Sequence, residues 1–79
     1  MTKSHRNILV TGGAGYVGAV LVPKLLAVGH HVTVLDLYLY GDDIFDGVRP
    51  HSSLREIKGD LRNSATVSQA LSGCDTVIH

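Results

Sequence analysis

Residues 11–18 of the chain read Thr11-Gly12-Gly13-Ala14-Gly15-Tyr16-Val17-Gly18. The segment before this run, residues 7–11, is short, apolar and partly β-branched, which predicts a strand buried on both faces. The segment after it, residues 15–28, changes to a helical period. Its apolar stripe consists of Val17, Val20, Leu21, Leu25, Leu26 and Val28. The glycine run therefore predicts a tight turn that joins a strand to a helix.

The spacing of three of these glycines, Gly12, Gly15 and Gly18, fits a turn that receives a pyrophosphate. The N-terminus of a helix presents unpaired N–H groups that favour an anion, and the anion approaches closely only where side chains are absent. Gly12 permits the turn out of the strand, Gly15 removes a Cβ near the phosphates, and Gly18 lets the helix pack closely on the strand. A purely structural turn is the alternative.

The next predicted strand, residues 31–36, ends in the acid Asp36, 18 positions after Gly18. A carboxylate at this place accepts hydrogen bonds from the adenosine ribose and repels a 2′-phosphate. Lys and Arg are absent from residues 37–40, which follow directly. These observations predict NAD rather than NADP as the dinucleotide. A solvated acid at the end of a strand is the alternative for Asp36.

The rest of the chain continues the alternation of strands and helices. It predicts a loop with one short helix over 37–53, an edge strand over 54–58 and a strand over 75–79. Before the last strand it predicts a helix that Asn63 or Ser64 caps, that has the apolar stripe Val67, Ala70 and Leu71, and that Gly73 ends. Such alternation predicts an α/β fold with right-handed crossovers. We expect a partial Rossmann fold whose parallel sheet has about four strands in the order 3-2-1-4, with helices on its faces. Residues 1–6 form a tail and residues 7–79 the half-domain.

The first helix contains Pro23, which removes one backbone hydrogen bond, so a kink is expected there. Gly29 is expected to end that helix as its C-terminal cap.

Composition excludes several classes of protein. Lys and Arg together number 7, as do Asp and Glu, so there is no basic excess of the kind that nucleic acid requires. No apolar segment approaches the ~18–20 residues of a membrane span. A single cysteine, Cys74, cannot form an intrachain disulfide and favours a reducing, cytoplasmic setting. The histidines show no metal-ligand spacing, so no metal site is expected.

The sequence resembles the N-terminal part of the extended short-chain dehydrogenase/reductase superfamily, in its NAD-dependent epimerase/dehydratase branch. The likeness rests on residues 11–18, on Asp36, on Gly59-Asp60-Leu61-Arg62 and on Asp75-Thr76-Val77-Ile78-His79. It implies that the backbone N–H groups of Tyr16 and Val17 bind the pyrophosphate.

The same likeness implies that Asp60 bonds the adenine amino group and that Leu61 packs on the ring. Leu37 and Tyr38 are candidates for the adenosine edge. A turn or capping aspartate is the alternative for Asp60, and Arg62 either pairs at the surface or faces a phosphate.

Members of this family typically act on nucleotide-activated sugars, using bound NAD and a Tyr-x-x-x-Lys motif. The tyrosines of this chain are followed four positions later by Val20, Asp42 and Ile44, so no catalytic residue is carried over. We expect the NAD-binding portion of an epimerase or dehydratase, an oxidoreductase-type enzyme, that is inactive alone. The alternatives are a non-catalytic NAD(P)-binding or sensing module, in which the exposed sheet edge forms a homo-oligomer, and an NADP-dependent reductase of the same superfamily.

Overall fold

The computed structural model describes residues 6–12, 15–38, 44–49 and 51–78, except for the side chains of residues 16 and 17. Most of the tail expected over residues 1–6 therefore lies outside the described residues. The elements, in chain order, are β1 (Asn7–Thr11), α1 (Tyr16–Val28), β2 (His31–Asp36), the 3₁₀ turn η1 (Asp46–Val48), β3 (Leu54–Lys58), α2 (Ser64–Leu71) and β4 (Thr76–Ile78).

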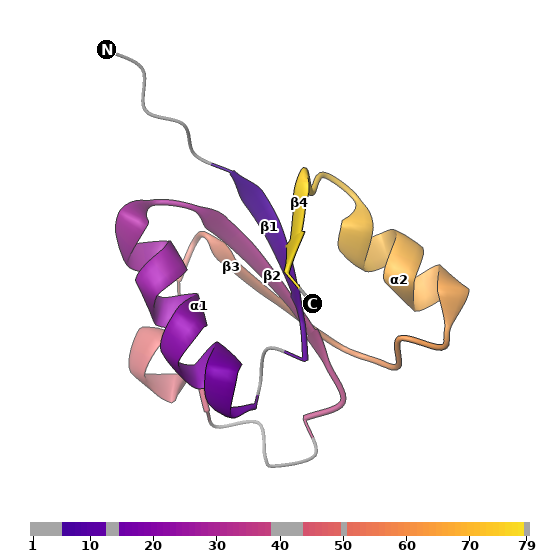
Figure 1. Ribbon diagram of the computed structural model, residues 1–79, viewed down its shortest axis with the longest axis horizontal. Helices are drawn as coiled ribbons and strands as arrows, with labels where there is room; N and C mark the ends of the chain where they lie inside the picture. Colours follow the sequence, from indigo (N-terminus) through magenta and orange to yellow (C-terminus); the bar gives the residue numbers. More distant parts are fainter. Residues whose placement is uncertain (1–5, 13–14, 39–43, 50, 79) are drawn as a thin grey trace.

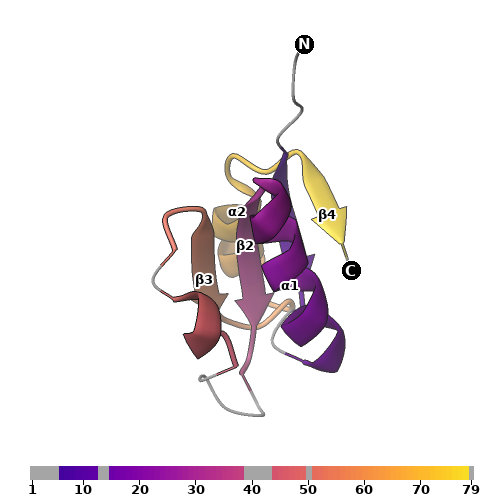
Figure 2. The same cartoon turned by 90° about the vertical axis from the view of Figure 1, so that its left-hand side faces the viewer.

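The four strands form one parallel sheet in the order β3-β2-β1-β4. Within the described residues β3 and β4 are its two edges, as Figure 2 shows. α1 lies on one face of the sheet and α2 on the other (Figure 1). This arrangement confirms the predicted partial Rossmann fold, its strand order and the position of the third strand at an edge.

The core has two layers because successive side chains of a strand point to opposite faces of the sheet. Ile8 and Val10 of β1 pack toward α1, whereas Leu9 between them packs toward α2. β2 alternates in the same way, and all three of these β1 side chains are buried. The first strand is therefore buried on both faces, as its apolar run predicts.

The face that α1 turns toward the sheet differs from the predicted stripe. Gly18, Val22 and Leu26, spaced four residues apart, are buried. Val20 and Val28, which the stripe placed toward the core, are 58% and 55% exposed. The prediction was wrong at Val20 and Val28 and right at Leu26. Since α1 is apolar nearly all round, with one charged residue in thirteen, its sequence carries little information about which side faces inward.

The ends of both helices follow their sequence signals. Gly29 adopts the left-handed conformation with φ 105° and its N–H donates to the carbonyl of Leu26 at 3.0 Å. The side chain of Asn63 accepts from the N–H of Thr66 at 3.1 Å and so caps α2. α1 runs unbroken through Pro23, and the kink expected there stays a prediction. None of the helices in the described part of the chain has the length and apolarity to cross a bilayer.

Candidate functional site

Two clefts lie at opposite ends of the sheet. The larger, about 230 Å³, is at the amino ends of the strands and is bordered by Asn7, His31 and Ser53. The smaller, about 190 Å³, lies at the carboxyl ends of β1, β2 and β3. Its lining consists of Gly12, Leu35, Asp36, Leu37, Gly59, Asp60 and Leu61. Ligands of open α/β sheets bind outside the carboxyl ends of the strands, so the smaller cleft is the candidate site.

The turn after β1 forms one wall of this cleft. Gly12 has φ +68°, a backbone conformation that residues other than glycine rarely adopt. Its N–H donates to the carbonyl of Leu35 at 2.9 Å. Gly15 caps α1 without any side-chain hydrogen bond, and no acid lies in the first turn. The N–H groups of residues 16–18 precede the first intrahelical bond, which Ala19 donates to Gly15. Residues 13 and 14 of the run lie outside the described residues.

Asp36 ends β2 directly beside this turn. One carboxylate oxygen, Oδ1, accepts from the N–H of Tyr38 at 2.7 Å. The other, Oδ2, lies 4.0 Å from the position that a Cβ would occupy at Gly12. The structure thus brings the predicted acid and the first predicted glycine together at one cleft.

Asp60 lies on the opposite wall and is bound by its near neighbour Arg62. Its Oδ1 accepts from the Arg62 backbone N–H at 2.8 Å, and its Oδ2 accepts from Nη2 at 2.6 Å. The guanidinium and the backbone N–H together lower the pKa of the Asp60 carboxyl to about 2. Of the two placements considered for Arg62, the structure shows the surface pair, and the Arg62 side chain is 89% exposed.

Leu37 and Leu61 provide exposed apolar surface at the mouth of the cleft. They are 41% and 46% exposed, and both line it. An exposed leucine beside a cleft offers a surface for a flat ring to pack on. Of the predicted site residues, Gly12, Asp36, Leu37, Asp60 and Leu61 therefore line one cleft. Gly15 and Gly18 are not in its lining, and Tyr38, a candidate for the adenosine edge, is buried in the core layer on the α1 side of the sheet.

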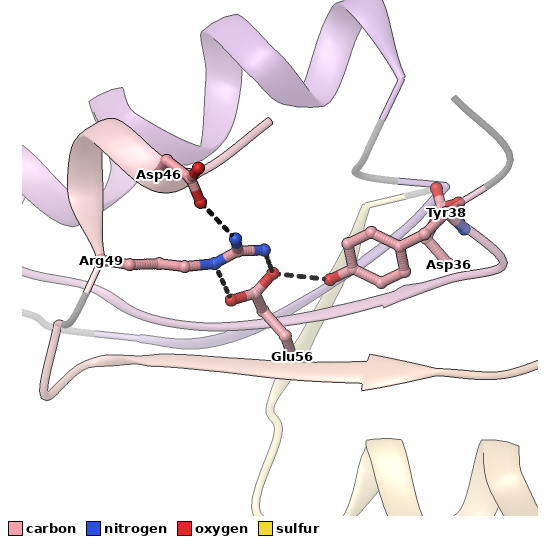
Figure 3. A network of polar contacts seen from close by, with 5 residues as sticks. All are labelled: Asp36, Tyr38, Asp46, Arg49 and Glu56. Carbon is pink, nitrogen blue, oxygen red and sulfur yellow. Dashed lines mark hydrogen bonds and ion pairs between the residues drawn. The ribbon is translucent and has the colours of Figure 1, made fainter. Parts of the chain in front are cut away.

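A polar network that the sequence did not predict lies behind Asp36 (Figure 3). The Tyr38 hydroxyl donates to Glu56 Oε1 at 2.8 Å, and Arg49 Nε donates to Glu56 Oε2 at 2.7 Å. Arg49 also donates to Asp46 at 2.7 Å. The hydrogen bonds from Arg49 lower the pKa of Glu56. Burial raises the pKa of Tyr38, and the hydrogen bond to Glu56 raises it further. Glu56 in a predicted edge strand carried no signal of this partnership.

The parallel sheet, the glycine turn after β1 and the acid after β2 define a Rossmann-type α/β domain. The chain belongs to the NAD dependent epimerase/dehydratase family, whose family model matches residues 8–79. This finding confirms the resemblance noted in the sequence.

Curated relatives include enzymes of different substrate classes. The chain is 39% identical over 73 residues to a 3-beta-hydroxysteroid dehydrogenase of Mycolicibacterium neoaurum, covering 92% of this chain and 18% of that protein. It is 33% identical over 82 aligned positions to a dTDP-glucose 4,6-dehydratase of Streptomyces niveus, covering 92% and 24%. The chain thus spans about a fifth to a quarter of the length of these relatives.

Among solved structures, the Bordetella bronchiseptica enzyme WbmF in complex with NAD+ and UDP matches with a TM-score of 0.76 and 32% identity. The match covers 94% of this chain and 22% of WbmF.

Proposed function

We propose that this chain binds NAD across the carboxyl ends of its strands and forms the cofactor-binding part of an enzyme that acts on a nucleotide-activated sugar. The observation that carries the proposal is that Gly12, Asp36 and Asp60 line one cleft. The glycine turn is thereby next to the two acids to which the proposal assigns the ribose and the adenine. Membership of the NAD dependent epimerase/dehydratase family supports it.

The residues of the cleft fit the cofactor. In the described part of the turn, Gly12 has the left-handed conformation and Gly15 begins α1 without a side-chain cap. In the proposal, the backbone N–H groups of Tyr16 and Val17 hold the pyrophosphate, and Asp36 accepts from the ribose hydroxyls. Leu37 and Leu61 pack against the adenosine, and Gly18 keeps α1 close to the sheet. When bound, NAD supplies a hydride acceptor.

Asp60 is proposed to accept from the adenine amino group, and its pair with Arg62 bears on this role. A carboxylate offers about four lone pairs, and three N–H groups of Arg62 already contact the two oxygens, with Nε–H shared between both. The adenine amino group therefore gains its acceptor when Arg62 rotates away. This movement is inexpensive because an exposed ion pair stabilises a protein little.

The choice of a nucleotide-activated sugar rests on two of the relatives. One is a dTDP-glucose 4,6-dehydratase, and one solved neighbour holds NAD+ and UDP. A second candidate substrate class is a 3β-hydroxysteroid, since a relative of that activity has the higher identity of the two curated relatives compared. In the proposal, either substrate contacts residues beyond these 79. The tyrosine and lysine that move protons in the family belong to those residues as well. A reducing, cytoplasmic setting is part of the proposal.

Calorimetric titration of the intact protein with NAD and, separately, with NADP tests the cofactor proposal. We expect NAD to bind more tightly because Asp36 would face the 2′-phosphate of NADP across the cleft. Absence of heat with either dinucleotide would overturn the proposal, and tighter binding of NADP would favour the reductase alternative.

Absorbance of reduced cofactor, followed with a panel of nucleotide sugars and 3β-hydroxysteroids, then separates the two substrate classes. NAD binding without turnover of any substrate in the intact protein would favour a sensing module.

A further inference from the structure

Tyr38 has a backbone conformation that its side chain disfavours. Its φ is +56°, and it is the one non-glycine residue with a positive φ in the described part of the chain. A bulky residue in the left-handed region is strained, and such strain persists only where the surroundings fix it and often marks a functional position. Tyr38 lies two residues beyond Asp36, the proposed ribose ligand.

Two contacts hold the Tyr38 side chain, and Arg49 supports one of them. Its ring is buried with Phe45 in the core layer on the α1 side of the sheet. Its hydroxyl donates to Glu56 Oε1 at 2.8 Å, and Glu56 is itself held by two hydrogen bonds from Arg49. Figure 3 shows the chain of contacts running from Arg49 through Glu56 to the tyrosine ring beside Asp36. The side chain thus ties the strained residue to β3 and to the segment after η1.

The strained backbone acts on Asp36 through one hydrogen bond. The N–H of Tyr38 donates to Asp36 Oδ1 at 2.7 Å, which fixes one oxygen of the carboxylate. The second oxygen, Oδ2, is thereby directed toward the turn at Gly12, where the ribose is proposed to lie. If the Tyr38 side chain lost its anchors, the backbone of residues 37 and 38 could shift and carry this N–H away from Oδ1, so the carboxylate would lose one of the contacts that orient it.

We propose that Tyr38, held by Glu56 and Arg49, is a positioning residue that fixes the Asp36 carboxylate and thereby sets the preference for NAD over NADP. This inference rests on the proposed function, since it needs a dinucleotide in the cleft. A fixed carboxylate is preorganised for two ribose hydroxyls and cannot turn away from a 2′-phosphate. A carboxylate that lacks this hydrogen bond is held less firmly, and so loses part of its attraction for NAD and part of its repulsion of NADP.

Two variants test the proposal in the intact protein by calorimetric titration with NAD and NADP. Tyr38→Phe keeps the buried ring and removes the bond to Glu56. Glu56→Gln keeps one oxygen that can accept from the hydroxyl but opposes an amide N–H to an Arg49 donor, and so weakens the support of that acceptor. We expect each change to lower the ratio of NAD to NADP affinity by about fivefold, with opposite changes in the two affinities.

Asp75→Asn is the matched control for the charge change in Glu56→Gln. Asp75 is an exposed acid before β4, at the amino end of the sheet, where its Oδ2 accepts from the N–H of Asn7. This variant should leave both affinities unchanged. Circular dichroism of each variant confirms that it folds, and an unfolded Tyr38→Phe leaves Glu56→Gln to decide.

A double-mutant cycle separates positioning from a general structural effect. In an Asp36→Ala background there is no carboxylate to orient, so Tyr38→Phe should no longer alter the affinity ratio. An equal change with and without Asp36, or no change in the presence of Asp36, would overturn the inference while NAD binding by the unsubstituted protein still supported the proposed function. No NAD binding by the unsubstituted protein would overturn both.

Discussion

At the scale of single residues, the carboxylates of the cleft region already have hydrogen-bond partners inside the chain. Asp36 accepts from Tyr38, Asp60 from Arg62 and Glu56 from Arg49. A ligand that needs one of these oxygens must add to its partners or displace one. The consequences differ because the partner is a fixed backbone N–H at Asp36 and a mobile, exposed guanidinium at Asp60.

Replacing Arg62 with Gln should therefore strengthen NAD binding by about two- to threefold. The change removes the guanidinium that competes with the adenine amino group for Asp60, while the backbone N–H of residue 62 remains. Calorimetric titration of the intact protein measures the effect, and Arg55→Gln, on β3 with its guanidinium bonded to carbonyls of α2, is the control. Weaker binding would mean that Arg62 contacts the cofactor itself, which is the alternative in which Arg62 faces a phosphate.

The Arg49–Glu56 pair should make part of the stability depend on acid pH. Since the folded state lowers the pKa of Glu56, the unfolded state binds the proton more readily, and the stabilisation is present above the ordinary pKa of 4.5 and is lost as pH falls through the lowered value. Glu56→Gln should therefore cost about 1 kcal/mol at pH 7 and less at pH 3. Urea unfolding at both pH values measures this difference, and a cost that does not shrink in acid would contradict it.

At the scale of elements, the connection between β3 and α2 has no room for a side chain at Gly59. The N–H of Gly59 donates to the carbonyl of Asp36 at 3.0 Å and extends the pairing of β2 with β3. A Cβ there would lie 2.5 Å from Cγ2 of Thr66 and 3.5 Å from Leu35. Because Thr66 is β-branched and sits in the first turn of α2, its methyl group has little freedom to move.

Gly59→Ala should accordingly destabilise the protein by about 1–3 kcal/mol, as overpacking does in other cores. Adding Thr66→Ser removes the methyl group that clashes and should restore most of the loss. Gly47→Ala, where a Cβ meets nothing within 4 Å, is the matched control and should be close to neutral. Urea unfolding of these three variants and of the unsubstituted protein measures these energies, and a failure of Thr66→Ser to rescue would place the strain elsewhere.

Signals that are local in the sequence predicted the elements well. The strands over 54–58 and 31–36, the cap at Asn63 and the helix end at Gly29 follow from short-range chemistry, and the structure has them at those residues. Asp75–His79 was predicted as a strand, and the structure has β4 as Thr76–Ile78, with residue 79 outside the described residues.

Features that depend on distant partners were not predictable. The inward face of α1 is chosen by the sheet, since its own sequence is apolar all round. The left-handed backbone conformation of Tyr38 depends on Glu56, 18 residues away, and on Arg49. Only the fold brings these three residues together. The glycine turn and Asp36 could be predicted because their spacing in the sequence is characteristic. The network of Tyr38, Glu56 and Arg49 could not, because these residues have no characteristic spacing.

At the scale of the whole molecule, the two clefts at opposite ends of the sheet offer a choice of binding site. The cleft at the amino ends is the larger and contains Ser52, Arg55 and Cys74. Volume alone would favour it. In a parallel sheet, however, the glycine turn, the N-terminus of α1 and the strand-end acids all lie at the carboxyl ends, so the groups that the proposal assigns to the dinucleotide are at the end of the sheet with the smaller cleft.

Hydrogen exchange of the intact protein with and without NAD distinguishes the two ends. We expect NAD to slow exchange in peptides that contain residues 15–18, 36–38 and 59–61, because bound phosphate and ribose pair with or shield their amides. Residues 52–55 and 72–74 border the cleft at the amino ends of the strands, and peptides that contain them serve as the internal control. Protection of these control peptides alone would move the binding site to the amino ends. Protection of the peptides at both ends of the sheet would indicate that NAD stabilises the sheet globally. In that case the slowest-exchanging amides of β1 and β2 would slow by the same factor as the amides of these peptides.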